Sequence, residues 1–388
     1  MTATDSYTSS GLLAVICAAA CSPAAVDEHS ANVTSKHGAI ARSDAGAGAG
    51  EAPDARGPRT PSDGCPANTG FAGDERCLAP PAAEAGFQLH YGPSDYASAL
   101  ELSPFVLAEG SEIVDCFYEK TPNTSDVYVS GYQFQMRPGS HHLLVNVNPE
   151  PQEDGFGECL INDMNAGLLG GTQTPKVDER ADPAPENEGL AVRLPARSQA
   201  VINFHVIDAG AEPILREAWL NYFYMNESDV KGLRGNVFLT GGLGYHIEPG
   251  TQQTYRYSCS PERPVRILSL AAHMHAHATR LSAWKVSAQH PTLVYEAFDW
   301  AEPLSLKYDS VHDNTDPDRA TLTPGGSSGA LTIEPGEALQ WECAIDNTSA
   351  DVLTFRNEVY TGEMCILVGV EVPTDEPMRP YDFTCLRQ

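Results

Sequence analysis

The chain has 388 residues, enough for two or three domains with sizeable hydrophobic cores. Its 52 acidic and 24 basic side chains give a formal net charge of -28, which repels nucleic acid and anionic membrane surfaces and so excludes polyanion binding. Ten cysteines without a CxxC pair favour disulfides in an oxidising compartment, and we therefore expect an exported protein.

The N-terminal residues 1–21 contain the apolar run GLLAVICAAAC, which is too short to span a bilayer and ends in small residues before Cys21. This pattern is typical of a bacterial lipoprotein signal, so lipidation at Cys21 is predicted, with plain secretion as the alternative. The expected location is the bacterial cell envelope, at the periplasmic or outer-membrane face, or outside the cell. Membrane contact is expected only through the lipid anchor.

Residues 22–83 are rich in Ala, Gly, Pro, Ser and Asp, a composition that buries too little apolar surface to fold. We expect a disordered tether here, with Cys65 and Cys77 able to close a small loop near its end. From residue 84 the sequence alternates short apolar and polar runs with turn residues between them. This pattern predicts an all-β fold of two tandem antiparallel, jelly-roll-like β-sandwiches, over residues 84–230 and 231–388.

The first predicted sandwich contains a pair of adjacent histidines, His141 and His142, directly after a Pro-Gly turn in RPGSHHLLVNV. A third histidine, His205, lies in the strand-like run VINFHVI. Neighbouring residues on a regular strand face opposite ways, so the pair can share a metal only where the strand is bent or just starting. In the alternative interpretation one histidine faces solvent and the other belongs to the core.

The second predicted sandwich places His273, His275 and His277 at alternate positions of the run RILSLAAHMHAH, so a strand would point all three the same way. Neutral imidazole is the commonest metal ligand, whereas Met274 belongs to the opposite, apolar face. Met364, in TGEMCILVGVEV, shares a face with apolar neighbours, and by itself it is typical of a core residue.

The order of these motifs resembles the copper type II, ascorbate-dependent monooxygenases, the family of peptidylglycine α-hydroxylating monooxygenase and dopamine β-monooxygenase. The resemblance covers residues 84 to 388 and implies two coppers per chain. One copper would bind three imidazoles, those of His141, His142 and His205. The second copper would bind two imidazoles and a thioether, those of His273, His275 and Met364.

The ligand types suit different tasks in that family. Three imidazoles hold copper in both redox states, while a soft thioether favours Cu(I), the state that reacts with dioxygen. The resemblance therefore implies hydroxylation of a substrate C–H bond at His273, His275 and Met364, with the second electron supplied from the other copper. Ascorbate or another one-electron reductant would recharge both. His277 is not a ligand in this scheme.

The eight cysteines after Cys21 allow 105 pairings, which the sequence alone does not decide. The resemblance implies three disulfides and leaves a fourth, local pair; these are Cys116–Cys159, Cys259–Cys385, Cys343–Cys365 and Cys65–Cys77.

The positions with which the amidating members grip a peptide carboxylate hold Ala271, Ile366 and Val368 here. The resemblance therefore points to a neutral or apolar substrate instead of a peptide. Asn203 stands two residues before His205, where those enzymes carry Gln, and is expected to orient the site by hydrogen bonding.

Two other functions remain open. The chain would be a copper-binding lipoprotein if it kept the ligands and lost the chemistry. It would be a zinc hydrolase if His273, His275 and His277 held one ion with water at a fourth position. For the leading interpretation we expect a monomer whose partners are a small-molecule substrate and dioxygen.

Overall fold

The computed structural model describes residue 65 and residues 68–148, 151–159, 167–180, 184–233, 237–241, 244–311, 331–371 and 383–387. The predicted signal segment, Cys21 and most of the predicted tether lie outside the described residues. Most described residues form β-strands, which confirms the all-β prediction. None of the helices in these ranges is long and apolar enough to cross a membrane.

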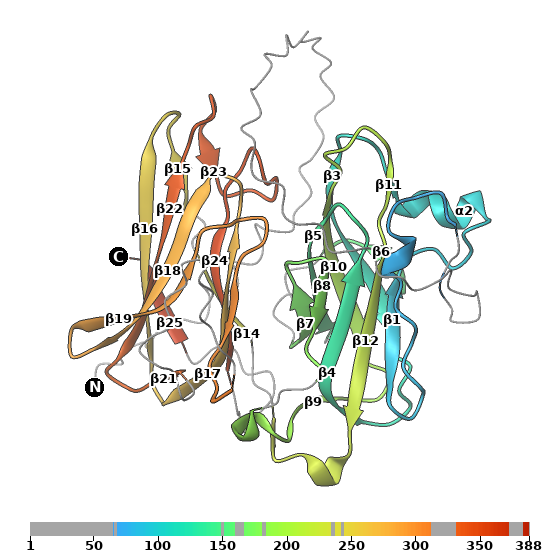
Figure 1. The fold of residues 1–388 in the computed structure, drawn as a ribbon, viewed down its shortest axis with the longest axis horizontal. Coiled ribbons are helices and arrows are strands. Elements are labelled where there is room, and N and C mark those ends of the chain that lie inside the picture. Colours follow the sequence, from blue (N-terminus) through green and yellow to red (C-terminus); the bar gives the residue numbers. More distant parts are fainter. Residues whose placement is uncertain are drawn as a thin grey trace, which may run out of the picture.

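The first sandwich has two main sheets and a small two-stranded ribbon (Figure 1). Its outer sheet contains β1 (Gly86–Tyr91), β4 (Val127–Met136), β8 (Lys176–Asp178), β9 (Leu190–Leu194), β12 (Ala218–Met225) and β13 (Gly232–Leu233). Its inner sheet has the order β6 (Gly155–Gly157), β3 (Glu112–Lys120), β10 (Gln199–Ile207), β5 (Ser140–Asn148) and β7 (Leu168–Thr172). The ribbon pairs β2 (Val106–Leu107) with β11 (Ile214–Leu215). The described part of this sandwich also contains the short helices η2 (Asp74–Arg76), α2 (Ala99–Leu102), η3 (Ser103–Phe105), η4 (Pro185–Asn187) and η5 (Glu227–Asp229).

The second sandwich repeats this two-layer plan. Its inner sheet contains β14 (Val237–Gly241), β24 (Cys365–Glu371), β17 (Val265–Met274), β20 (Ser305–Lys307) and β21 (Leu331–Ile333). Its outer sheet has the order β19 (His290–Ala297), β18 (Ala278–Ser287), β22 (Ala338–Asp346), β16 (Gln252–Pro261) and β25 (Phe383–Arg387), and a ribbon pairs β15 (His246–Ile247) with β23 (Leu353–Thr354). The inner sheets of the two sandwiches face each other in Figure 1, with β17 and β24 opposite β5 and β10.

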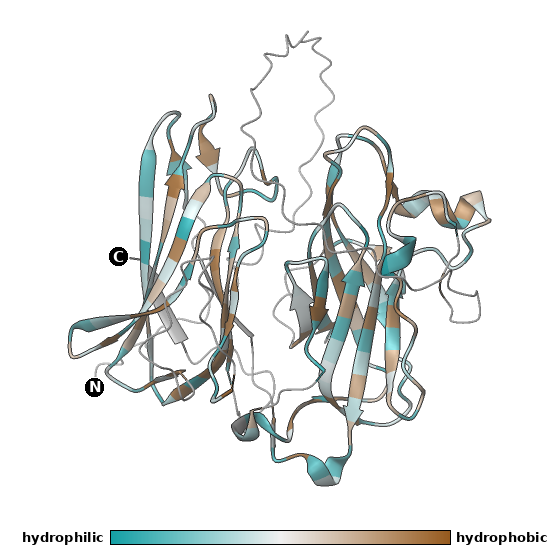
Figure 2. Ribbon diagram, in the orientation of Figure 1, coloured by the Kyte–Doolittle hydropathy of each residue, from teal (hydrophilic) through white to brown (hydrophobic). Residues whose placement is uncertain are grey.

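The alternating sequence pattern explains why these strands form sandwiches. Along β22 every second residue is buried, so Leu339, Trp341, Cys343 and Ile345 enter the core while their neighbours face outward. Figure 2 shows the same alternation of hydrophobic and hydrophilic residues along β4 and β12. Burying one apolar face of each sheet against the other supplies the main stabilisation of each domain.

The facing surfaces of the two inner sheets are also covered. On β10, Ala200, Ile202, Phe204 and Val206 enter the first core, yet the residues between them are buried too, because the second sandwich and a disulfide cover that face. Across the interface, Leu190 clusters with Leu268 and Val370, and the Lys307 ammonium lies 2.6 Å from the Glu179 carboxylate. The two sandwiches are therefore packed together along these sheets.

The folded region begins earlier than the composition predicts. The guanidinium of buried Arg137 donates to the Ala72 carbonyl at 2.9 Å and lies 2.8 Å from the Asp74 carboxylate. A disulfide joins Cys65 to Cys77. Residues 68–83, assigned by composition to the tether, thus pack on the first sandwich, because a cross-link, an ion pair to buried Arg137 and the packing of Phe71 against the first core hold them there.

The boundary between the domains lies slightly beyond the predicted position after residue 230. Strand β13 still pairs with β9 of the first sandwich, whereas β14 pairs with β24 of the second. The chain therefore changes domain between residues 233 and 237.

Three of the four expected disulfides are present, namely Cys65–Cys77, Cys116–Cys159 and Cys343–Cys365. Cys259 is also disulfide-bonded and lies opposite Cys385 in the backbone register of β16 and β25. The side chain of Cys385 lies outside the described part of the chain.

Candidate metal centre

A bulge in β5 brings the adjacent histidines of the first sandwich together. His205 of β10 pairs with His142, but the next residue, Val206, pairs with Ser140, so His141 is the extra residue. A bulge of this kind bends the strand and re-aims side chains, which is the condition that two neighbouring histidines require in order to share a metal. The ligand nitrogens of His141, His142 and His205 lie within 4.8 Å of one another.

The turn that precedes this bulge depends on Gly139. Its φ of +90° lies in the left-handed region, and a Cβ atom there would lie 2.4 Å from Cδ1 of Ile214. A side chain at this φ is strained, whereas glycine adopts it freely. The Pro-Gly pair in the sequence thus sets the start of the strand that carries His141 and His142.

The second set of predicted ligands lies at the end of the β17–β24 pair. Met274 pairs with Cys365, and both side chains are in the second core, as expected for Met274. Adjacent strand residues alternate, so His273 faces the first sandwich. The N–H of His275 donates to the Met364 carbonyl at 3.1 Å, which continues the pairing by one residue and places Met364 beside His275.

The two sets lie next to each other across the domain interface. The ring centroids of His142 and His273 are 4.9 Å apart, and those of His141 and His275 are 6.2 Å apart. A ligand nitrogen of His141 also lies within 4.8 Å of those of His273 and His275. Five histidines from two domains thus form one cluster, and His141 belongs to both of its metal-competent groups.

Burial keeps four imidazoles of this cluster neutral, those of His141, His142, His273 and His275. Desolvation, followed by repulsion from His273 and His205, lowers the pKa of His141 to about 2. Desolvation and His205 likewise lower the pKa of His273 to about 3. The same causes hold the pKa values of His142 and His275 well below the usual range. At neutral pH these imidazoles therefore offer lone pairs, the form in which histidine binds metals.

Several imidazole nitrogens in the cluster have no hydrogen-bond partner among the described residues: Nε2 of His141, Nδ1 of His142, and both ring nitrogens of His275. An unsatisfied buried polar group costs about 1–3 kcal/mol. A metal ion would satisfy these nitrogens, so the donor set fits a copper ion. Met364 follows His275 in the backbone pairing, and its thioether would favour Cu(I) if it completed the donor set of His273 and His275.

A carboxylate that the sequence pattern does not reveal holds His205. Oε1 of Glu112 lies 2.7 Å from Nε2 of His205, which therefore donates and leaves Nδ1 as the open nitrogen. Glu112 lies on β3, where Val114 pairs with His205, so the carboxylate reaches the histidine diagonally. Only the strand register, which links residues 93 positions apart, identifies this partner.

Asn203, which was expected to orient the site, contacts a disulfide. Its amide Nδ2 donates to the Cys116 and Cys159 sulfurs at 3.4 and 3.5 Å. At His205 itself, Glu112 supplies a hydrogen bond.

A second carboxylate, Glu363, is fully buried beside the methionine. Its Oε1 accepts from the N–H of His275 at 3.0 Å and from the N–H of Met364 at 2.9 Å. Desolvation raises the pKa of Glu363 to about 8, although the backbone hydrogen bonds favour the charged form. The acidic residue within the otherwise apolar GEMCILVG was the available sequence signal.

His277 belongs to neither metal-competent group of the described chain. Strand β17 ends at Met274, so the two-residue alternation does not continue to His277. Its Nε2–H donates to the Tyr360 carbonyl at 2.9 Å. The three-histidine zinc arrangement is therefore not assembled.

The positions expected to face a substrate lie on the same surface as His273. Ile366 pairs with His273, and Val368 pairs with Ala271. All three apolar side chains are partly exposed, and they offer no group that would bind a carboxylate.

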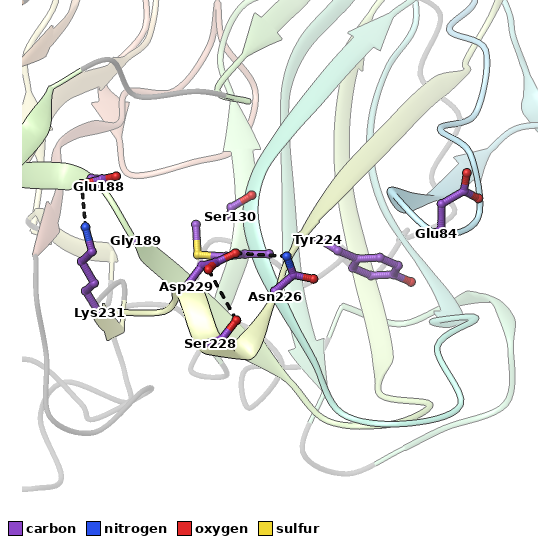
Figure 3. Close-up of a pocket in the computed structure, with 10 residues that line it drawn as sticks. Glu84, Ser130, Glu188, Gly189, Tyr224, Asn226, Ser228, Asp229 and Lys231 are labelled. Carbon is purple, nitrogen blue, oxygen red and sulfur yellow. Dashed lines mark hydrogen bonds and ion pairs between the residues drawn. The ribbon is translucent and has the colours of Figure 1, made fainter.

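A separate pocket has a volume of about 590 Å³, and none of the histidines lines it. Figure 3 shows its lining residues. Its polar groups are largely satisfied by one another, because Lys231 lies 2.6 Å from Glu188 and Asn226 donates to Asp229 at 3.0 Å. The lining of this pocket therefore does not indicate a catalytic or metal-binding site.

No family model matches the chain, and no curated protein matches it. Two solved structures are similar over much of its length. The crystal structure of the STIV MCP is 9% identical, covers 69% of this chain and 93% of its own, and gives a TM-score of 0.24. The crystal structure of PBCV-1 VP54 fitted into a cryo-EM reconstruction of the virophage Sputnik is 9% identical in sequence. The match covers 80% of this chain and 96% of that structure's chain, with a TM-score of 0.26. At this similarity neither structure bears on function.

Proposed function

We propose that this chain is a copper-dependent monooxygenase that hydroxylates a C–H bond of a small, neutral or apolar substrate with dioxygen and an ascorbate-like reductant. The observation that carries the proposal is the placement of Met364 beside His275, next to a set of three imidazoles from the other domain. This combination of donors matches the motif order of the copper type II monooxygenases.

His141, His142 and His205 would hold one copper, and His273, His275 and Met364 the other. When bound, copper supplies one-electron redox chemistry and activation of dioxygen. The protein keeps the imidazoles neutral by burial, and Glu363 fixes the backbone of His275 and Met364 with two hydrogen bonds. The packing of the two inner sheets shields most of the ligands from bulk water, since His141, His273 and His275 are at most 7% exposed.

The substrate class follows from the surface next to His273. Ile366 and Val368 present apolar groups where the peptide-amidating enzymes place polar ones. A substrate bound there would gain stabilisation from apolar burial without a charge interaction.

We also propose an exported, envelope-bound protein. Its three described disulfides require an oxidising compartment, and the N-terminal lipobox-like sequence would supply an anchor at Cys21. Residues 22–64 would then form the tether.

A copper-binding function without catalysis is the second candidate. It is favoured by the burial of the proposed ligands, since His275 is 0% and Met364 6% exposed. A buried site suits storage as well as chemistry.

Copper stoichiometry and oxygen consumption test these proposals together. The wild-type protein is expected to bind two coppers and to consume oxygen with ascorbate in a substrate-dependent way. The variants His205→Ala and Met364→Ala should each retain one copper. His205 is the cleaner choice for the first site, because its ring contacts are with His141 and His142, whereas His141 adjoins both groups.

Two copper sites without substrate-dependent oxygen consumption across a panel of neutral substrates would favour the storage function. A protein that retains only zinc, and whose metal content is indifferent to Met364→Ala, would overturn both copper proposals.

A further inference from the structure

One oxygen atom of Glu112 is shared by the two sandwiches. Its Oε1 accepts from Nε2–H of His205 in the first sandwich at 2.7 Å. The same Oε1 accepts from the backbone N–H of Val359 in the second sandwich at 3.0 Å. The side chain is only 21% exposed, so both hydrogen bonds form in a partly desolvated setting where they are strengthened.

Val359 belongs to the loop of residues 355–364, which ends at Met364. It is fully buried, and its carbonyl accepts from the N–H of Ala276, the residue after His275, at 3.2 Å. The backbone of Val359 thus links Glu112, through its N–H, to Ala276, through its carbonyl. Ala276 follows His275, a proposed metal ligand.

The rest of this loop is tightly constrained. The N–H of Gly362 donates to the Glu358 carbonyl at 2.9 Å, and the N–H of Glu363 donates to the Thr354 carbonyl at 3.0 Å. A Cβ at Gly362 would lie 2.4 Å from Cβ of Arg356, so the loop is close-packed. A displacement at Val359 would therefore be passed on to Met364 rather than absorbed within the loop.

We propose that Glu112 is a positioning residue for the metal centre. It fixes the tautomer of His205, and it holds the loop that carries Met364 in place against the first sandwich. The inference rests on the proposed copper-binding function for its effect on the metal. The docking itself depends only on contacts within the protein.

The two roles of Glu112 have different chemical requirements. Docking of Val359 needs only an acceptor, which an amide oxygen also supplies. A carboxylate paired with a ligating histidine additionally raises the basicity of the imidazole, and removing such a partner typically lowers metal affinity about 10- to 100-fold. Glutamine and alanine substitutions therefore separate the roles.

The test compares Glu112→Gln, Glu112→Ala and the control Glu109→Gln, which removes the same charge at an exposed position three residues earlier. Hydrogen exchange is measured on metal-free protein at the Val359 amide. Copper affinity at the first site is measured in a Met364→Ala background, so that only that site is titrated.

For Glu112→Ala, we expect exchange of the Val359 amide to accelerate about tenfold or more, as for the loss of one hydrogen bond to a charged group. Copper affinity should fall about 10- to 100-fold. Glu112→Gln should keep slow exchange but lose affinity, and the control should match wild type in both. If the alanine variant does not fold, the glutamine variant still tests the affinity role.

The proposal is overturned if Glu112→Ala leaves Val359 exchange at the wild-type rate, or if Glu112→Gln binds copper as tightly as the control. Failure of the proposed function has a different signature, because a protein that binds no copper would still show the exchange difference at Val359.

Discussion

The metal-free protein should lose stability steeply below pH 6.5, because four buried imidazoles must stay neutral in the folded state. Burial holds the pKa of His141 at about 2 and that of His273 at about 3, and it keeps those of His142 and His275 well below the usual value. In the unfolded chain the same groups titrate at about 6.5.

Stability falls with pH because the two states bind different numbers of protons. Below pH 6.5 the unfolded chain binds protons that the folded protein does not, so stability falls as the pH falls. At pH 5.5 each such histidine costs about 1.4 kcal/mol relative to pH 7.5, and the four together cost about 6 kcal/mol. Buried Glu119 and Glu363 offset part of this loss, because burial raises their pKa values to about 7 and about 8 and they take up protons in the folded state over the same pH range. That loss is comparable with the whole stability of many domains. The loss continues as the pH falls toward the folded-state values near 2 and 3.

Urea denaturation of metal-free protein at pH 7.5, 6.5 and 5.5 measures this effect. The variant His273→Gln, which has no imidazole to protonate, should lose about 1.4 kcal/mol less than wild type between pH 7.5 and 5.5. His290→Gln, on an exposed strand position, is the matched control and should behave like wild type. A His273→Gln variant that loses as much stability as the wild type between pH 7.5 and 5.5 would refute the buried, neutral cluster.

Three further predictions test the support of the ligands. Glu363→Ala should reduce the free energy of unfolding by about 1–3 kcal/mol, because it removes the acceptor of the Met364 N–H, while Glu363→Gln should lose less; urea titration measures both. Replacing Cys343 and Cys365 together by alanine should cost about 3 kcal/mol for a separation of 22 residues, and an unchanged melting temperature would contradict this. Gly139→Ala should cost at least about 1–2 kcal/mol from its positive φ, and should weaken copper binding at the adjacent histidine pair; copper titration with wild-type affinity would argue against the turn's role.

The sequence predicted those parts of the fold that follow from local periodicity. The Pro-Gly turn before His141 indicates where the strand is bent. Along β24 the alternation was predicted but the core face was not: the sequence pattern indicates a core face with Ile366 and Val368, whereas Cys365 and Leu367 fill the second core. The proximity of His141, His142 and His205 was expected only from the resemblance in motif order. Local periodicity does not give it, because it depends on the pairing of two strands that lie far apart in the sequence.

Contacts between the domains could not be predicted in this way. The proximity of His142 to His273 depends on how two sheets dock, and periodicity within one strand does not encode docking. Glu112 and Glu363 were missed for a related reason, since an acidic residue in a strand is usually solvent-exposed and its partner is set by register or loop path. The composition of residues 68–83 likewise gave no sign of the ion pair between Asp74 and buried Arg137.

The central claim is that Met364 is a copper ligand rather than a core residue. X-ray absorption spectroscopy of the Cu(I)-loaded protein tests it directly, because sulfur and nitrogen scatterers are distinguishable. We predict one sulfur ligand per two coppers in the wild type, absent in Met364→Ala and retained in Met274→Leu, whose methionine lies in the core of the same sandwich. A spectrum without a sulfur ligand in the wild type, or one unchanged by Met364→Ala, would contradict the account.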